Sequence, residues 1–250
     1  MLGQALVLPL LFSGAALQDQ VPALSPSGQT APALGPGQLR HSTAQELLVV
    51  TEVSRIRLHP REYAKWLRTQ LKYFEGTLWR LPDHVPIRTN EGASALQELI
   101  DFLESTPVVG PLRWNEGLSH AARQLVLEQG PTGQTGHKGP AGSTVRDRVL
   151  KFGLHQSLLG EVINYGDEKP RWTVMQLLID DGVPNRGHRK NLFNPDFHVA
   201  GAAIGPHSEY GSMTVVDLVD DYTSNPEYQE RAILSPAEIG KPASTTNGNQ

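Results

Sequence analysis

IDDGVPNRGHRKN, residues 179–191, is the stretch that decides the fold and the chemistry of this chain. It places two acids, Asp180 and Asp181, a few residues before His188, and arginines flank that histidine. A purely structural loop has no need for so many ionisable groups. Imidazole titrates near neutrality and carboxylates hold its tautomer, so the combination can bind a divalent cation or move protons.

Two upstream positions carry the same chemistry. His137 lies in a loop of glycines and prolines at 130–142, and Glu161 follows Gly160 where a strand is expected to start. A carboxylate in a strand has little structural reason to be there unless it is paired. From the residues alone, the favoured interpretation of His137 is a solvated surface histidine. If the fold brings these residues together, they form a cleft with two imidazoles and two carboxylates.

The acids and arginines of residues 179–191 also have structural interpretations. Asp181 is a plausible C-terminal helix residue, although an acid there opposes the helix dipole at a cost of about 0.3–1 kcal/mol. That cost favours a partner such as His188 or a cation. Asp180 is a rival for the role, and we expect it to be solvated or bonded to backbone. Arg186 and Arg189 are expected to pair acids or cap carbonyls.

The first half of the chain shows helical patterns. Thr43 and Glu46 form a capping-box signature, which predicts a helix over 42–71 with an interruption at Pro60. Apolar residues at helical spacing predict a helix around 96–103 and another that begins after Asn115. Residues 79–88 are expected to form a loop.

The second half mixes helices and strands. We expect Ser143 to cap a short helix that ends at Gly153, and a second helix over 170–181. Strands are expected at 158–165, 199–204 and 213–219. Three strands with helices before and between them predict an α+β layered domain.

Residues 112–222 resemble the CAP superfamily, the SCP-like extracellular domain of cysteine-rich secretory, pathogenesis-related and allergen-type proteins. The resemblance implies a three-layer α-β-α sandwich with a small antiparallel sheet between helices. It also implies that His137, Glu161, Asp181 and His188 share one cleft. Residues 87–92 and 180–183 further resemble a bacterial and protist branch. The landmarks that carry the resemblance are Leu112-Arg113-Trp114, Gly136-His137, Arg148, Gly160-Glu161, Gly187-His188-Arg189-Lys190-Asn191-Leu192, Asn194-Pro195-Asp196-Phe197 and Val199-Ala200-Gly201.

Two departures from that family pattern matter. Val162 stands where relatives usually carry an asparagine after the glutamate, which removes any role for that amide. Many relatives are stapled by disulfides, whereas this chain contains no cysteine. It can therefore form neither a disulfide nor a thiolate metal site.

Composition limits the partners and the compartment. The net charge of −4 with scattered basic residues gives no electrostatic footprint for nucleic acid. Residues 1–16 combine an apolar run with small residues near Ala15 and Ala16, which predicts a signal peptide and a secreted protein, although no Lys or Arg precedes the run. We expect a Pro- and Gly-rich linker at 17–41, the CAP domain at 42–226 and a polar, disordered tail at 227–250, with no transmembrane segment in the mature chain.

Two functions remain open from the sequence. The first is a binding module for a lipid, peptide or cell-surface ligand, with Zn²⁺ as the ion that suits two imidazoles and oxygen ligands. The second is a hydrolase that uses a metal-activated water, with Glu161 or Asp181 as the base. The predicted metal ligands are His137, His188, Glu161 and Asp181. A purely structural extracellular domain is a third interpretation.

Overall fold

The structure is a computed structural model that describes residues 42–82, 85–166 and 169–226. The segments 1–16, 17–41 and 227–250, expected to be a signal peptide, a linker and a polar tail, lie outside the described residues. No helix in the described part of the chain is long and apolar enough to cross a membrane.

The predicted helix over 42–71 forms as two helices, α1 (Ala44–Leu58) and α2 (Pro60–Arg68). Thr43 and Glu46 form the predicted capping box at the start of α1. The break falls at Pro60, as expected, because proline has no N–H to continue the helical hydrogen bonds.

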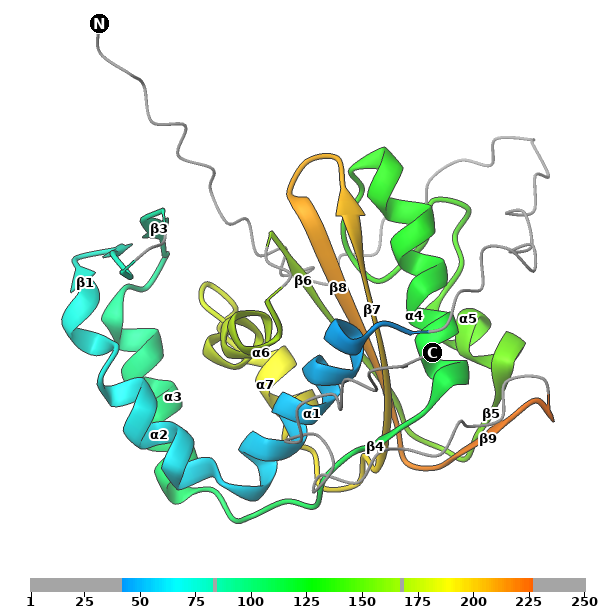
Figure 1. The fold of residues 1–250 in the computed structure, drawn as a ribbon, viewed down its shortest axis with the longest axis horizontal. Coiled ribbons are helices and arrows are strands. Elements are labelled where there is room, and N and C mark those ends of the chain that lie inside the picture. The colour runs from blue at the N-terminus through cyan, green and yellow to red at the C-terminus, as the bar shows by residue number, and fades with distance from the viewer. Residues whose placement is uncertain (1–41, 83–84, 167–168, 227–250) are drawn as a thin grey trace, which may run out of the picture.

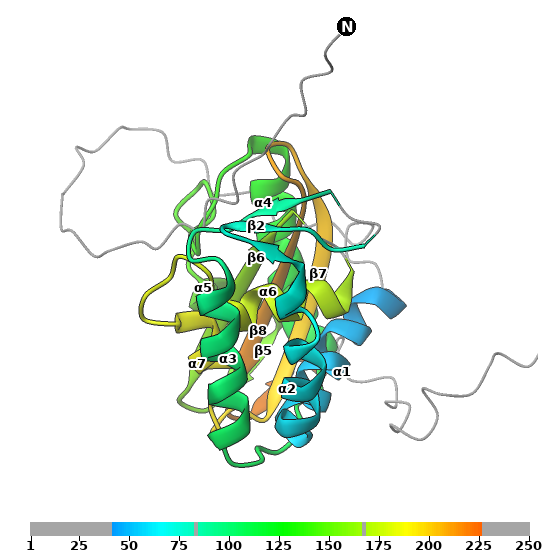
Figure 2. The same ribbon diagram turned by 90° about the vertical axis from the view of Figure 1, so that its left-hand side faces the viewer.

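A small antiparallel sheet and a third helix follow. The 3₁₀ turn η1 (Leu71–Tyr73) leads into β1 (Phe74–Glu75), β2 (Leu78–Trp79) and β3 (Ile87–Arg88), and then α3 (Ala93–Ser105) packs against α2. The sheet lies at the left-hand end in Figure 1 and faces the viewer in Figure 2. The expectation of a loop over 79–88 was wrong at both ends, because Trp79 pairs with Ile87. Strands of two residues are too short to show periodicity in the sequence.

The remaining elements build the main domain. Asn115 caps α4 through a bond from the Leu118 N–H, as predicted. The elements in chain order are β4 (Arg113–Trp114), α4 (Glu116–Gln129), the 3₁₀ turn η2 (Gly130–Thr132), α5 (Val145–Phe152), β5 (Gly153–His155), β6 (Leu159–Tyr165), α6 (Pro170–Ile179), α7 (Gly187–Leu192), β7 (Val199–His207), β8 (Gly211–Val219) and β9 (Tyr222–Ser224).

The central sheet has the strand order β4-β7-β8-β6. The pairs β7–β8 and β8–β6 are antiparallel, whereas β4 runs parallel to β7. Helices α4 and α5 cover one face of this sheet and α1, α6 and α7 lie on the other (Figure 1). This arrangement is the predicted α+β, three-layer α-β-α sandwich.

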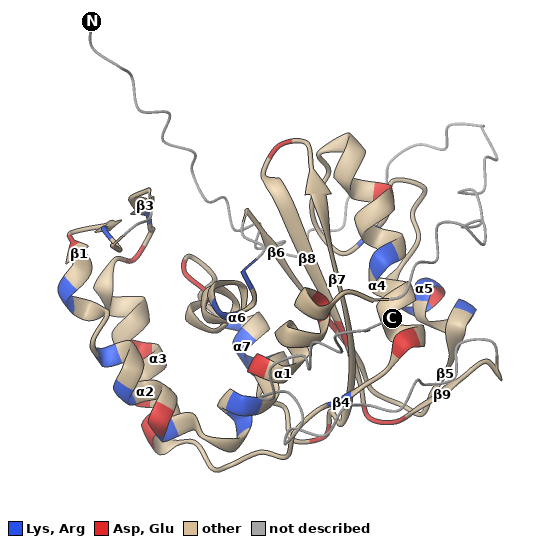
Figure 3. Ribbon diagram, viewed as in Figure 1, with Lys and Arg blue, Asp and Glu red and all other residues tan. Residues whose placement is uncertain are grey.

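Alternation along the strands explains the layers. On β6, Val162 packs in the core that includes α1 and α6, whereas Ile163 packs in the core under α4. Successive strand residues point to opposite faces, so a single strand contributes to both cores. Charged residues lie mostly on the helices and connections, and few lie on the strands of this sheet (Figure 3).

Helix α4 approaches the sheet closely at Gly201. A Cβ at this position would lie 2.3 Å from the backbone nitrogen of Ser119, so glycine is required for the helix to pack there. This contact fixes the distance between α4 and β7, and the loop that carries His137 follows from the end of α4.

One local prediction was wrong. Thr144, not Ser143, caps α5, because it forms a capping box with Asp147, while the Ser143 hydroxyl donates to Glu128. Residues 187–192 form the short helix α7, which the sequence did not predict. Its six residues are too few to show a helical repeat, and basic and polar side chains dominate it.

Candidate functional site

His137 pairs with Glu161, as the predicted cleft requires. The imidazole Nδ1 lies 2.9 Å from Glu161 Oε1, and Arg148 Nη2 donates to Glu161 Oε2 at 2.6 Å. The side chains of Arg148 and Glu161 are 0% and 2% exposed, whereas that of His137 is 52% exposed. Because both oxygens of the carboxylate accept hydrogen bonds, the proton of the neutral imidazole resides on Nδ1.

Uncharged groups hold the glycine-rich loop around His137. Gln129 Nε2 donates to the carbonyl oxygens of Gly136 at 2.7 Å and Lys138 at 2.9 Å. The Tyr165 hydroxyl accepts from the Gly136 N–H and donates to Gln129 Oε1. Burial raises the pKa of Tyr165 to about 12, so this hydroxyl remains a donor at neutral pH. The backbone of the His137 loop is therefore anchored at several points.

A second carboxyl lies behind Glu161. Asp217 on β8 is directly opposite Glu161 in the antiparallel register, and both of its oxygens are buried. Burial raises the pKa of Asp217 well above its ordinary value, and the neighbouring charge of Glu161 raises it further. Asp217 therefore takes up a proton more readily than an ordinary aspartate does. The sequence analysis missed this residue, because β8 gives no local sign that it pairs with Glu161.

His188 pairs with Asp180 rather than with Asp181. Asp180 Oδ1 lies 2.7 Å from His188 Nδ1, and Asp180 Oδ2 accepts from the His188 backbone N–H at 2.9 Å. Of the two alternatives expected for Asp180, solvation is wrong, because its side chain is fully buried, and bonding to backbone is confirmed by the His188 N–H. Asp180 ends α6 in the left-handed conformation, with a φ of 55°, and this turn directs its carboxylate to the start of α7.

Asp181 faces the N-terminal part of the chain instead. Its Oδ2 accepts from the backbone N–H of Asn90 at 2.6 Å and from the Asn90 side-chain amide at 3.1 Å, and its Oδ1 accepts from the Glu91 N–H at 2.8 Å. Two adjacent acids thus point to different partners. Asp180 orients the imidazole, and Asp181 ties the α6–α7 turn to the segment before α3.

Four charged residues clamp this turn. Arg186 donates to Glu91 through Nη1 and Nη2, each at 2.7 Å, and to Glu98 through Nε at 3.0 Å. Arg189 Nη1 donates to Glu98 at 2.8 Å. The Arg186 hydrogen bonds lower the pKa of Glu91 to about 2, and its two acid partners raise the pKa of Arg186. The prediction that the two arginines pair acids is confirmed.

The acids of this clamp were not foreseen. Glu91 and Glu98 lie about 90 positions before their arginine partners. Neither shows a local motif, and helix α3 alone would present Glu98 as an ordinary surface residue. Only the packing of α3 against α6 brings them to the turn.

Three of the four predicted metal ligands lie in two imidazole–carboxylate pairs, His137 with Glu161 and His188 with Asp180. The fourth, Asp181, lies in neither pair. Within the described residues, no three or more His, Cys, Asp or Glu side chains gather into a group that could hold a metal ion. Zn²⁺ sites use three or four protein ligands, so the four predicted residues in this arrangement do not supply such a set.

The imidazoles themselves are oriented for recognition. Each presents Nδ1 to a carboxylate, and within the described residues neither Nε2 has an intramolecular hydrogen-bond partner. This is the orientation in which a carboxylate fixes the tautomer and leaves Nε2 as a lone-pair acceptor.

Two further histidines, His198 and His207, have backbone partners. His198 Nδ1 bonds the Asp220 carbonyl, and His207 Nε2 bonds the Gln134 carbonyl at 2.9 Å. His207, the last residue of β7, is buried beside the loop that leads to His137. Neither histidine is part of the two imidazole–carboxylate pairs.

The family model of the cysteine-rich secretory protein family, CAP, matches residues 108–218. This matched part of the chain, called the CAP domain below, is similar to that family. It contains His137, Glu161, Asp180 and His188, whereas α1, α2, the small sheet and α3 precede it.

Two solved structures are similar to the chain. An outer surface protein from Borrelia burgdorferi is 22% identical, with a TM-score of 0.38, and the match covers 44% of this chain and 78% of that one. An extracellular protein containing an SCP domain from Bacillus anthracis is 20% identical, with a TM-score of 0.36, and the match covers 50% of this chain and 40% of that one. No curated protein shows significant sequence similarity to the chain.

Proposed function

We propose that this protein is a secreted binding module in which His137 and His188 recognise an uncharged, hydrogen-bonding ligand such as an extended peptide. One observation carries the proposal: each imidazole is tied by Nδ1 to a carboxylate while its Nε2 has no partner within the described residues. Two pre-oriented acceptors suit N–H donors of a ligand, because oriented side chains lose little entropy on binding.

The charges around the imidazoles support an uncharged ligand. Glu161 is neutralised by Arg148, and the acids beside His188 are either buried or paired with arginines. A strongly charged ligand would therefore find no unpaired counter-ion among these residues. Hydrogen bonds are the interaction that remains available, and they confer specificity when both partners are oriented.

The hydrolase alternative is less well supported. A general base must present a free lone pair to a water within about 2.6–3.2 Å. Both oxygens of Glu161 accept hydrogen bonds, from His137 and Arg148, and both oxygens of Asp181 accept from backbone N–H groups. Glu161 is also ion-paired with Arg148, its side chain is 2% exposed and Asp181 is buried, so water has little access to either carboxylate.

A phage-displayed random peptide library tests the proposal on the full-length protein. We expect enriched peptides, which are then synthesised and titrated by calorimetry. The variants His137→Ala and His188→Ala should each weaken binding about tenfold, in line with the loss of a hydrogen bond of about 1.4 kcal/mol. His198→Ala is the matched control and should bind like the parent, because His198 is exposed and bonds the Asp220 carbonyl rather than either carboxylate of the two pairs.

The selection is run in EDTA and again in Zn²⁺. Equal enrichment in both shows that the imidazoles act without a metal, whereas enrichment only with Zn²⁺ restores the predicted ion to the site. The proposal is overturned if no peptide is enriched in either condition, or if the enriched peptides bind the histidine variants as tightly as the parent.

A further inference from the structure

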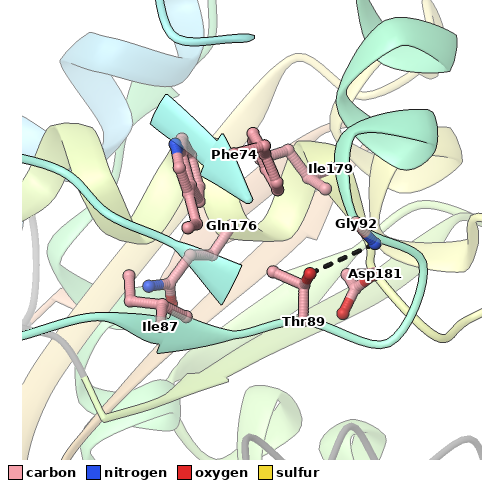
Figure 4. A pocket seen from close by; sticks show the side chains of 8 residues that line it. Phe74, Ile87, Thr89, Gly92, Gln176, Ile179 and Asp181 are labelled. Atoms are coloured by element: carbon pink, nitrogen blue, oxygen red, sulfur yellow. Dashed lines mark hydrogen bonds between the residues drawn. The ribbon is translucent and has the colours of Figure 1, made fainter. Parts of the chain in front are cut away.

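A second feature lies on the opposite side of the α6–α7 turn. Phe74, Trp79 and Ile87 from the small sheet line a pocket together with Ile179 of α6, Thr89 and Gly92. Figure 4 shows most of these side chains around the pocket. Phe74 and Trp79 stack with ring centroids 4.9 Å apart, which gives the pocket a flat aromatic wall. Five of the lining residues, between positions 74 and 92, precede the CAP domain, whereas Gln176, Ile179 and Asp181 lie within it.

We propose that this pocket binds an aliphatic or single-ring side chain of a peptide. The proposal deepens the proposed function, on which its choice of a peptide rests, by naming the side-chain class that the ligand carries. The pocket itself stands on independent contacts.

The space is suited to an apolar group rather than to water. The empty volume is about 380 Å³ with the open mouth included, and about 20 Å³ of it can hold the centre of a water molecule. A site needs about 10–15 Å³ and two to four polar partners to retain one water. Here the walls are almost entirely apolar, and the Asp181 oxygens are already engaged by Asn90 and Glu91. Any water in the pocket is poorly held, and an apolar group that displaces it gains affinity.

The Gln176 amide in the pocket wall indicates which polar group the ligand carries next to its apolar side chain. Gln176 lines the pocket, and its Oε1 accepts from Asn164 Nδ2 at 2.7 Å. Its Nε2 makes no hydrogen bond within the described residues, and Figure 4 shows the amide extending toward Ile87. An amide N–H calls for an acceptor on the ligand, and a peptide carbonyl adjacent to an apolar side chain supplies one.

The charge of the rim distinguishes a peptide from a fatty acid. Asp181 is the one charged residue among the described residues that line the pocket, so a ligand carboxylate would meet like charge. The small space also excludes a bulky polycyclic ligand. An uncharged peptide residue such as leucine or phenylalanine satisfies both limits.

The two sites are joined through consecutive residues. Asp180 orients His188, and Asp181 is part of the pocket wall, so a single turn builds both. Adjacent Cα atoms lie about 3.8 Å apart. A peptide that places a side chain in the pocket therefore passes along the turn that carries the His188 pair.

The test titrates the full-length protein with N-acetyl-leucinamide while methyl signals of Ile87 and Ile179 are followed by NMR. We expect saturable shifts at these methyls with a dissociation constant on the order of 1–10 mM, as suits so small a ligand. N-acetyl-glycinamide, which lacks the side chain, should produce no saturable shift.

Variants test whether the shifts arise from binding in this pocket. Ile87→Phe fills the pocket and Phe74→Ala removes a wall, and each should weaken binding at least tenfold as read at Ile179. Leu78→Ala is the matched control, because Leu78 lies in the same small sheet but does not line the pocket. If Leu78→Ala weakens binding as much as Ile87→Phe, the site is not this pocket.

Two outcomes overturn the proposal outright. One is the absence of saturable shifts with N-acetyl-leucinamide, and the other is tighter binding of decanoate, which would assign the pocket to an acyl chain. The double variant His137→Ala with His188→Ala separates this proposal from the proposed function. It should bind N-acetyl-leucinamide like the parent even if the peptide selection fails.

Discussion

The two histidines that lie in imidazole–carboxylate pairs are held in place by different kinds of contact. His137 extends from a glycine-rich loop that neutral hydrogen bonds and one buried arginine hold in place, and its side chain is 52% exposed. His188 follows a turn between two left-handed residues, Asp180 and Arg186, and its side chain is 19% exposed. Non-glycine residues in this conformation cost about 1–3 kcal/mol each and persist only where surrounding contacts over-determine them.

The two imidazoles are therefore held in place by different sets of contacts. On the His188 side, the charged clamp of Arg186, Arg189, Glu91 and Glu98 supplies the contacts that hold the strained turn. On the His137 side, Arg148 is the charged contact to Glu161, and the loop backbone depends on Gln129 and Tyr165. We therefore expect one imidazole to depend on ion pairs contributed from outside the CAP domain and the other on contacts within it.

The largest effect is expected at Arg148. Arg148→Met leaves Glu161 buried without its cation and removes donors to the carbonyls of His137 and Ser143. Breaking a buried ion pair on one side costs about 3–5 kcal/mol, so urea denaturation should show a loss of this size. Arg146→Met, an exposed neighbour on the same helix, should change stability by less than about 0.5 kcal/mol. A loss below about 1 kcal/mol for Arg148→Met would mean that this pair does not hold the loop.

Replacing Arg186 in the clamp should lower stability by a smaller amount, and that amount should depend on the replacement. Arg186→Ala removes the bonds to Glu91 and Glu98 and should cost about 2 kcal/mol, less than a fully buried pair because both acids are partly exposed. Arg186→Gly loses the same bonds but accepts the φ of 50° without strain, so it should be about 1 kcal/mol more stable than Arg186→Ala. The comparison is made by urea denaturation. Equal stability of the two variants would show that the left-handed turn stores no strain.

The same contrast explains what the sequence could predict. His137, Glu161 and His188 sit in recognisable motifs, and the helices and long strands follow from capping signatures and apolar periodicity. Asp180 and Asp181 are adjacent and chemically identical, so only the left-handed turn at Asp180 decides which one meets His188. Glu91, Glu98 and Asp217 act through tertiary packing between distant segments, and no local pattern marks such pairs.

On the His137 side, Asp217 should make the free energy of unfolding depend on pH. Because its pKa is raised in the folded state, its contribution to stability is fully present below the unfolded pKa of about 3.9 and declines as pH rises above it. Asp217→Asn stays uncharged and should not show this decline, so it should be more stable than the parent at pH 7. Asp196→Asn, at an exposed position, is the control and should follow the parent curve. The measurement is urea denaturation from pH 4 to pH 8, and parallel curves for Asp217→Asn and the parent would contradict it.

The smallest expected effect is on the melting temperature at acidic pH and comes from Glu91 of the clamp. The pKa of Glu91 is lowered to about 2 by its hydrogen bonds with Arg186, so its contribution is present above the unfolded pKa of about 4.3 and is lost as pH falls toward 2. Glu91→Gln cannot lose a charge, so its melting temperature should fall less steeply than that of the parent between about pH 4.5 and pH 2. Glu46, whose pKa burial raises but bonds from Arg123 and backbone N–H groups lower to about 2, keeps part of the slope in both proteins. Glu75→Gln is the matched control, since Glu75 forms an ion pair with Arg80 in which both side chains are largely exposed. If Glu75→Gln flattens the acid limb as much as Glu91→Gln does, the clamp holds the His188 turn no better than a surface ion pair would.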